Sequence, residues 1–277
     1  MFADLHLHSK FSDGSDTTEI LVEKLLAAGI TTFALTDHDT VAGLPSLIEA
    51  ANGRARVITG VEFSCMEQGK SCHILGFGFA PDAPSILRAL AHGQELRREN
   101  FRRRLAHLEH NHGIVFSPEE LAWLSAKNSV SRAHIMTLLI RHGYADSYQD
   151  GMEKYMNACK DSEVRLGAKE AITAILDAGA IPVWAHPLGG EGEAHEFPEG
   201  LLPTLLAYGI RGMECYYSRY TPEECDGLIK LAKRHGLLIS GGSDYHGTNK
   251  TVALGTLCAD GHPVSRERLT VLEALKM

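Results

Sequence analysis

Residues 4–8 read Asp-Leu-His-Leu-His ("DLHLH"), and this stretch decides how the rest of the chain is interpreted. Leu5 and Leu7 are typical core residues of a β-strand, in which side chains alternate between the two faces. His6 and His8 therefore point to the same side. Two neighbouring buried imidazoles repel each other when charged and need partners when neutral. A shared metal ion would satisfy both, provided that the chain supplies further ligands, because a short motif alone also has structural explanations.

The composition is that of an ordinary globular protein of 277 residues, with 44% hydrophobic and 22% charged residues. No apolar run is long enough to span a bilayer and no signal-peptide pattern precedes the first strand, so we expect a cytoplasmic protein without a membrane partner. The six cysteines include no CxxC pair, which argues against a disulfide framework and a thiolate zinc site. A net charge of −8 disfavours a broad nucleic-acid surface, but it allows a local site for a small phosphorylated ligand. No obligate protein partner is evident.

Strand-like segments alternate with helix-like segments along most of the chain. The strand-like segments are residues 2–8, 30–39, 54–64, 72–79, 180–187, 210–217 and 237–246. This alternation predicts an α/β fold with a parallel sheet, and seven or so repeats suggest closure into a barrel. Helical periodicity replaces it over residues 84–166, where Ser117 and Glu120 form a capping-box pattern. We interpret residues 84–166 as an α-helical insertion, or lid, over one end of a barrel built from residues 1–83 and 167–277.

Potential metal ligands follow almost every strand-like segment, at the edge where parallel α/β folds collect their functional side chains. The nine predicted ligands are His6, His8, Asp13, His38, Glu62, His73, His186, Asp244 and His246. Imidazole and carboxylate without thiolate suit Mn²⁺, Zn²⁺ or Fe²⁺, of which we expect Mn²⁺ first. One ion needs about three protein ligands, so we expect two or three divalent ions bridged by Glu62. Such a cluster suits phosphoester hydrolysis.

Some of these residues have simpler explanations. His73 lies among apolar residues and also fits a hydrogen-bonded core histidine. Asp39 is interpreted as a cap of the helix that follows "TDHDT", and Asp37 as an outer support for a histidine ligand. Independent coincidence at every strand end is implausible, so the metal centre remains the better interpretation.

The segments "DLHLHSKFSDGS", "ALTDHDTVAG", "GVEFS", "AHP" and "GGSDYHG", in this order, resemble the motifs of the PHP family, which is named for its polymerase and histidinol-phosphatase members. The resemblance implies a distorted (β/α)7 barrel, related to the amidohydrolases, with a trinuclear metal centre that hydrolyses phosphoesters. The three ligand groups that it implies are His6, His8, Glu62 and Asp244; Glu62, His73 and His186; and Asp13, His38 and His246.

The helical segment is similar to that of one branch of the family, which carries an "SRAH"-type motif, here residues 131–134. That branch includes phosphatases of nucleotide 3′,5′-bisphosphates and 5′→3′ exonucleases acting on short RNA, which implies a nucleotide substrate. The residue types of this motif also favour phosphate binding, because a helix N-terminus attracts an anion and an arginine can donate two parallel hydrogen bonds to a phosphate. The predicted substrate-binding residues are Ser131, Arg132, His134 and Lys160. By contrast, "RRENFRRR" (residues 97–104) is typical of a solvated helix face.

The sequence therefore predicts a metal-dependent phosphoesterase that removes the 3′-phosphate from nucleotide 3′,5′-bisphosphates. Asp13, His38, His186 and His246 are the predicted catalytic residues, and either His186 or His246 would protonate the leaving alkoxide. A 5′→3′ exonuclease acting on short RNA or DNA is the alternative. Amide hydrolysis fits less well, because no lysine lies at a strand end to bridge the metals as in related barrels. A non-catalytic metal-binding module is the third possibility.

Overall fold

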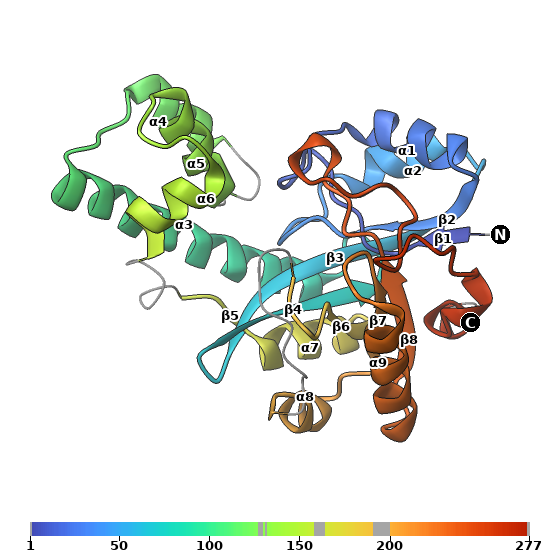
Figure 1. Cartoon of the computed structure of the whole chain (residues 1–277). Coiled ribbons are helices and arrows are strands. Elements are labelled where there is room, and N and C mark those ends of the chain that lie inside the picture. Colours follow the sequence, from blue (N-terminus) through green and yellow to red (C-terminus); the bar gives the residue numbers. More distant parts are fainter. Residues whose placement is uncertain (1, 127–129, 131, 158–163, 191–199, 276–277) are drawn as a thin grey trace.

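Figure 1 shows the computed structural model of the chain, which describes all residues except 1, 127–129, 131, 158–163, 191–199 and 276–277. The strands are β1 (Phe2–Asp4), β2 (Ile30–Leu35), β3 (Arg56–Glu67), β4 (Lys70–Phe77), β5 (Leu166–Gly167), β6 (Ile181–Ala185), β7 (Gly212–Tyr217) and β8 (Leu238–Gly242). The α-helices are α1 (Thr18–Ala27), α2 (Leu44–Ala51), α3 (Pro84–His112), α4 (Pro118–Ser125), α5 (Arg132–Arg141), α6 (Tyr148–Gly151), α7 (Ala168–Asp177), α8 (Leu202–Tyr208), α9 (Pro222–Arg234) and α10 (Val271–Ala274). The shorter turns are a π-helical turn, η1 (Met152–Met156), and two 3₁₀ turns, η4 (Gly247–Asn249) and η5 (Arg266–Arg268).

The strands form a nearly closed barrel in the order β1-β2-β3-β4-β6-β7-β8, and the short β5 pairs with β3. β8 meets β1 where Leu5 N donates to Gly241 O (3.2 Å) and Asp244 N donates to His6 O (2.9 Å). Gly242 permits this close approach, because a Cβ at that position would lie 2.2 Å from the Cβ of His6. The predicted distorted (β/α)7 barrel with a helical insertion is confirmed.

The direction of β4 differs from the all-parallel prediction. β4 runs antiparallel to both of its neighbours, β3 and β6. Gln68 and Gly69 connect β3 to β4 with φ angles of 51° and 74°, the two-residue turn with positive φ that favours a β-hairpin. His73 consequently lies inside β4, where it is paired with Ser64 of β3. The start of β4 thus reaches the same edge of the barrel as the ends of the parallel strands.

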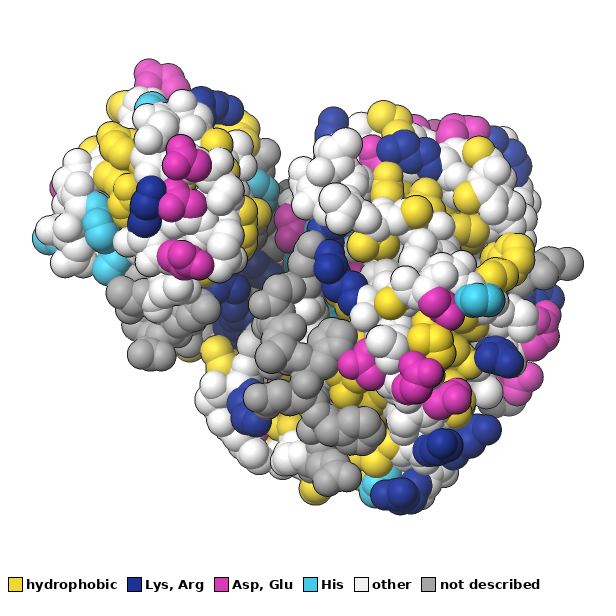
Figure 2. All heavy atoms as spheres, in the orientation of Figure 1, with side chains coloured by type: hydrophobic (Ala, Val, Ile, Leu, Met, Phe, Trp, Pro, Cys, Tyr) yellow, Lys and Arg dark blue, Asp and Glu magenta, His cyan; other side chains and the backbone are white. Residues whose placement is uncertain are grey.

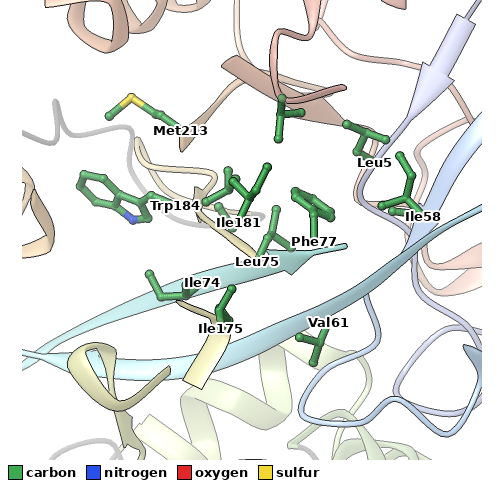
Figure 3. Close-up of a cluster of buried hydrophobic side chains, with 14 of the residues drawn as sticks. Leu5, Ile58, Val61, Ile74, Leu75, Phe77, Ile175, Ile181, Trp184 and Met213 are labelled. Carbon is green, nitrogen blue, oxygen red and sulfur yellow. The ribbon is translucent and has the colours of Figure 1, made fainter. Parts of the chain in front are cut away.

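A large hydrophobic core fills the barrel and the layer beneath its helices. Figure 3 shows part of this core, in which Leu75 and Phe77 of β4 lie near Ile181 and Trp184 of β6. Burial of such apolar surface is the dominant stabilising contribution in folding. This packing holds the strand ends, and therefore the polar side chains that follow them, in fixed positions.

A second hydrophobic cluster lies in the helical segment between β4 and β5, where Phe101 and Leu108 of α3 pack with Leu124 of α4. We call the described residues between 100 and 157 the helical lobe; Figure 1 shows it beside the barrel, with α3 running from one to the other. The predicted capping box is present, because Glu120 N donates to Ser117 Oγ (3.3 Å) and Ser117 N donates to Glu120 Oε2 (3.0 Å). Across the ranges that the structure describes, no helix has the length and apolarity needed to cross a membrane.

Candidate metal centre

Glu62 of β3 is fully buried and surrounded by imidazoles. On the Oε2 side, the oxygen–nitrogen distances are 3.0 Å to His6, 3.1 Å to His8 and 3.2 Å to His38. On the Oε1 side, they are 2.7 Å to His73 and 3.2 Å to His186. The two carboxylate oxygens thus face two different sets of imidazoles, which is the arrangement expected of a carboxylate that bridges two cations.

Asp244 and Asp13 complete the cluster on either side of His8. Asp244 Oδ1 lies 3.2 Å from His8 Nε2 and 3.5 Å from His6 Nε2. Asp13 Oδ1 lies 3.2 Å from His246 Nε2. The candidate ligand atoms form three groups, each within 4.8 Å: His6, His8, Glu62 and Asp244; His8, Asp13, His38 and His246; and His38, Glu62 and His73. These groups contain eight of the nine predicted ligands, with His8, His38 and Glu62 each in two groups, and His186 joins the cluster through its contact with Glu62 Oε1 (3.2 Å).

Some buried nitrogen and oxygen atoms of this cluster form no hydrogen bond. Among the described residues, neither ring nitrogen of His8 has a hydrogen-bond partner, nor does Asp13 Oδ1, although all three atoms are buried. Buried polar atoms without hydrogen bonds are costly unless something else satisfies them. Converging imidazole and carboxylate atoms of this kind fit a divalent cation such as Mn²⁺, Zn²⁺ or Fe²⁺.

The pKa values of the cluster are shifted by burial and by mutual attraction. Burial raises the pKa of Glu62, but the surrounding imidazoles, that of His38 first, outweigh burial and hold this pKa well below its usual value. Burial lowers the pKa of His8, but its contacts with Asp244 and Glu62 outweigh burial and raise the pKa to about 9. Burial, helped by the nearby His8, lowers the pKa of His246. The carboxylates are therefore ionised at neutral pH, while His8 retains a proton that a bound cation would displace.

Glu214 of β7 is a further buried carboxylate beside the centre, which the sequence analysis missed. Its Oε1 lies 3.0 Å from His6 Nδ1, and its Oε2 accepts a hydrogen bond from the backbone N of His186 (2.8 Å). With Nδ1 of His6 donating to Glu214, the Nε2 atom is the one that faces Glu62. A single glutamate within the buried strand "GMECYY" (residues 212–217) was the available signal, because a buried carboxylate needs partners.

Asp244 is held from its outer side by Tyr217 and Lys250. Tyr217 Oη donates to Asp244 Oδ2 (2.8 Å), and Lys250 Nζ lies 2.6 Å from the same oxygen. The Oδ1 atom is thereby turned toward the histidines. His246 Nδ1 donates to the backbone O of Asp244 (2.8 Å), which leaves His246 Nε2 facing Asp13. The φ of 56° at Asp244 is a strained, left-handed conformation of the kind that concentrates at functional sites.

The helix-cap prediction for Asp39 is wrong. α2 begins after Gly43, which provides no side-chain cap. The carboxylate of Asp39 instead accepts a hydrogen bond from Ser64 N (3.0 Å) and forms an ion pair with Arg97 of α3. The tertiary contact with α3, which could not be inferred from the local sequence, took precedence over helix capping.

Asp37 also differs from its predicted role as a support for a histidine. Its carboxylate accepts hydrogen bonds from the backbone N and Oγ of Ser9 (both 2.7 Å) and from Ser12 Oγ (2.5 Å). These bonds hold the loop that follows β1 and carries Asp13. Asp37 therefore positions a candidate ligand through the backbone of its loop.

A cavity leads from the metal centre toward the helical lobe. Its lining includes Asp13, His38 and His73 of the centre, and four arginines: Arg97, Arg104, Arg132 and Arg165. Figure 2 shows the hollow between the lobe and the barrel, with Lys and Arg side chains at its base. The cavity therefore joins the candidate metal ligands to a strongly cationic surface.

The predicted substrate-binding residues are only partly brought together. Arg132, at the start of α5, lines the cavity. His134 packs edge-on against Trp123 (6.0 Å between ring centroids) and is not among the described residues that line the cavity. Ser131 and Lys160 lie outside the described residues.

The arginine-rich stretch 97–104 divides between two faces of α3. Its exposed members Arg98, Arg102 and Arg103 pair with nearby glutamates, as expected for a solvated face. Arg97 and Arg104 instead line the cavity, which the sequence analysis missed. Their spacing of seven residues was the available signal, because it places both on the same side of a helix.

Comparison with known proteins agrees with this geometry. Residues 4–176 match the model of the PHP domain. The chain is 30% identical over 254 residues to the phosphoribosyl 1,2-cyclic phosphate 1,2-diphosphodiesterase of Eggerthella lenta, covering 89% of this chain and 95% of that protein. It is 30% identical over 247 residues to the 3′,5′-nucleoside bisphosphate phosphatase of Chromobacterium violaceum, covering 88% of this chain and 86% of that protein. It is 31% identical over 259 residues to the 5′-3′ exoribonuclease Rnm of Escherichia coli, covering 91% of this chain and 87% of that protein.

Solved structures show the same relationship. An amidohydrolase from Chromobacterium violaceum with bound sulfate matches with a TM-score of 0.80 and 30% identity, over 99% of this chain and 97% of that chain. A Bifidobacterium adolescentis protein assigned as a metal-dependent phosphoesterase also matches with a TM-score of 0.80, at 28% identity, over 94% and 93%. With a matching family model, relatives over most of its length and a converged set of ligands, this chain belongs to the PHP family of metal-dependent phosphoesterases.

Proposed function

We propose that this phosphoesterase hydrolyses small nucleotides that carry two phosphates, with the 3′-phosphate of a nucleoside 3′,5′-bisphosphate as the group removed. The observation that carries the proposal is the lining of the cavity, which includes residues of the metal centre and a group of arginines. A substrate with one phosphate at each end could place one phosphate at the metal centre and the other among the arginines. The Chromobacterium violaceum relative, named for this activity, supports the same substrate class.

The nine clustered residues would hold two or three divalent ions, with Glu62 as the bridging ligand and Mn²⁺ as the first candidate. Such ions would polarise the phosphoryl group and offset its negative charge. Asp13 and His38 line the cavity and would act at the face that meets the substrate. Arg132, with the rest of the segment 84–166, would bind the second phosphate.

The contacts and pKa directions of the two candidate proton donors favour His186. His246 donates its Nδ1 proton to a backbone carbonyl and has a lowered pKa, so its Nε2 is suited to bind a cation. Burial lowers the pKa of His186, but contact with Glu62 outweighs burial and raises it. His186 is therefore the better donor of a proton to the leaving oxygen, in any state in which its Nε2 is not bound to a cation.

The proposal is tested by incubating the Mn²⁺-loaded protein with each substrate and measuring both inorganic phosphate and, by chromatography, released mononucleotides and ring-opened phosphomonoesters. The panel contains nucleoside 3′,5′-bisphosphates, nucleoside monophosphates, short 5′-phosphorylated RNAs and a ribose 1,2-cyclic phosphate. We expect the highest kcat/KM for the bisphosphates, with loss of the 3′-phosphate. Higher kcat/KM for 5′-phosphorylated RNA would establish the exonuclease alternative, and higher kcat/KM for the cyclic ester would identify a cyclic phosphodiesterase.

Asp244→Asn is the matched inactive control for this panel. The substitution keeps the shape of the side chain but removes the charge that faces His6 and His8. We expect turnover to be abolished while circular dichroism shows an unchanged fold. Unaltered activity would exclude the ligand assignment, and bound metal without phosphate release from any substrate by the wild-type protein would favour the non-catalytic module. A cytoplasmic location stays a prediction.

A further inference from the structure

The sequence analysis interpreted residues 97–104 as a solvated helix face and gave Arg97 no function. We propose that Arg97 is a catalytic residue that contacts the reacting phosphate at the metal centre, whereas the arginines nearer the lobe bind the second phosphate. The first half of this inference rests only on phosphoester hydrolysis at the metal centre. The second half rests on the proposed bisphosphate substrate.

The position of Arg97 places its guanidinium at the metal end of the cavity. Its Nη2 atom donates to Ser64 Oγ (2.5 Å), and that Oγ lies 3.4 Å from His38 Nδ1. Ser64 is also the strand partner of His73. Arg97, His38 and His73 all line the cavity. A phosphate that binds beside these two histidines would therefore meet the guanidinium.

Arg97 is held in a fixed orientation by Asp39. Its Nε atom forms an ion pair with the Asp39 carboxylate, whose Oδ1 also accepts a hydrogen bond from Ser64 N (3.0 Å). One turn earlier on α3, Gln94 Nε2 donates to the backbone O of Asp39 (3.0 Å). The Arg97 side chain is only 19% exposed. This anchoring orients the guanidinium before substrate binds, which is the condition under which a donor stabilises a transition state most effectively.

Among the described residues, Asp39 and Ser64 are the hydrogen-bond partners of the Arg97 guanidinium. Arginine has five N–H donors in a planar fork, and the bonds to Asp39 and Ser64 use two of them. The Nη1 edge is thus suited to bind phosphate oxygens in a bidentate manner. Because Asp39 offsets the charge of Arg97, the contribution is directed hydrogen bonding more than net charge.

Two of the other cavity arginines lie toward the lobe, whereas Arg165 directly precedes β5 and donates from Nη1 to Ser71 Oγ of β4 (2.9 Å). Arg104 follows Arg97 by seven residues on α3, a rise of about 10 Å toward the lobe. Arg132 begins α5, inside the lobe. The exposed Arg98, next to Arg97 in the chain, pairs with Glu95 and does not line the cavity. The cavity thus offers Arg97, anchored by Asp39, at the metal end, and Arg104 and Arg132 at a distance suited to a second phosphate.

The chemistry gives such a residue a defined task. In hydrolysis the bond between phosphorus and the sugar oxygen breaks, a bond to a water oxygen forms, and one proton of that water ends on the sugar oxygen. Negative charge is spread over the three equatorial phosphoryl oxygens during transfer. Arg97 forms no covalent bond and keeps its protons; it donates hydrogen bonds to those equatorial oxygens. Loss of one preorganised donor of this kind typically lowers kcat by about 10²–10³-fold.

The test compares Arg97→Ala and Arg97→Lys with Arg98→Ala as the matched control. Activity is measured on p-nitrophenyl phosphate and on the phosphomonoester that the wild-type protein hydrolyses fastest, and bound metal is measured by mass spectrometry. We expect Arg97→Ala to lower kcat by about 10²–10³-fold, with unchanged metal content and a KM change of a few-fold. Added guanidinium ion should restore part of the lost kcat. Arg98→Ala should behave as wild type.

Two outcomes would overturn the proposal. One is a kcat of Arg97→Ala within about threefold of wild type. The other is a loss of kcat that follows a loss of bound metal and is not restored by guanidinium, which would make the role of Arg97 structural. If Arg97→Ala does not fold, Arg97→Lys decides: it keeps a cation beside Asp39 but lacks the fork, so full kcat in this variant would also refute the proposal. A substrate with a single phosphate tests Arg97 even if bisphosphates are not preferred.

Discussion

Metal binding to this protein should release protons, and its affinity should rise with pH. In the metal-free protein the pKa of His8 is about 9, because its contacts with Asp244 and Glu62 outweigh the effect of burial. A raised pKa means that His8 is protonated below about pH 9, whereas a metal ligand must be neutral. At pH 7 the protonated form then exceeds the neutral form by about 100-fold. The apparent affinity should therefore be about 100-fold weaker at pH 7 than above pH 9, or about 2.7 kcal/mol.

The assay is a calorimetric titration of the metal-free protein with Mn²⁺. At one pH, buffers with different ionisation enthalpies give the number of protons released, which we expect to be at least one at pH 7. Repeating the titration between pH 6 and 8 should show the affinity rising at least tenfold per pH unit, because burial lowers the pKa of His6 but Glu214 and Glu62 outweigh burial and raise this pKa as well. Asp244→Asn removes one of the two carboxylates that raise the pKa of His8, so this variant should release fewer protons.

A pH-independent affinity with no proton release would refute this reasoning. It would mean that His8 is already neutral in the metal-free protein, and that Glu62 and Asp244 do not act on it as the distances of 3.1 and 3.2 Å indicate.

Three further substitutions test other parts of the structure. Glu214→Gln removes the charge that orients His6, so metal affinity should fall about 10–100-fold with little change in circular dichroism; full affinity by metal titration would contradict the assigned contact. Arg132→Ala should mainly raise KM for bisphosphates, and an equal loss on substrates with one phosphate would argue against its role. Ser117→Ala removes the cap of α4 and should lower the free energy of unfolding by about 1 kcal/mol in urea titrations, while Mn²⁺ affinity stays unchanged.

The ligand cluster was predictable because strand ends converge in a barrel. His6, Glu62 and Asp244 lie far apart in the chain, but His6 and Asp244 follow buried strands and Glu62 lies within β3, and the topology brings these positions together. The hairpin between β3 and β4 was also within reach of the sequence, since Gln68-Gly69 between two β-like runs is a turn signal. The general pattern of alternating strands and helices obscured it.

The contacts made by the helical lobe and by outer supporting residues could not be predicted in the same way. Asp39 has every local property of a helix cap, and only the position of α3 in space gives it Arg97 as a partner. Lys250 likewise lies six residues after Asp244 in a stretch with no regular periodicity, so its contact with that carboxylate depends on the fold of the loop. Such contacts arise from tertiary packing, which local patterns do not encode.

The unbroken course of α3 has a consequence for the position of the helical lobe. Its first turns are fixed to the barrel, where Ser85 Oγ donates to the backbone O of Ala174 (2.8 Å), and its last turns are part of the core of the lobe at Leu108. α3 is a continuous helix of 29 residues without an internal proline, and its internal Gly93 lies against Asp39, so this connection resists bending more than a loop would. We therefore expect the lobe to keep its position relative to the barrel when a ligand binds.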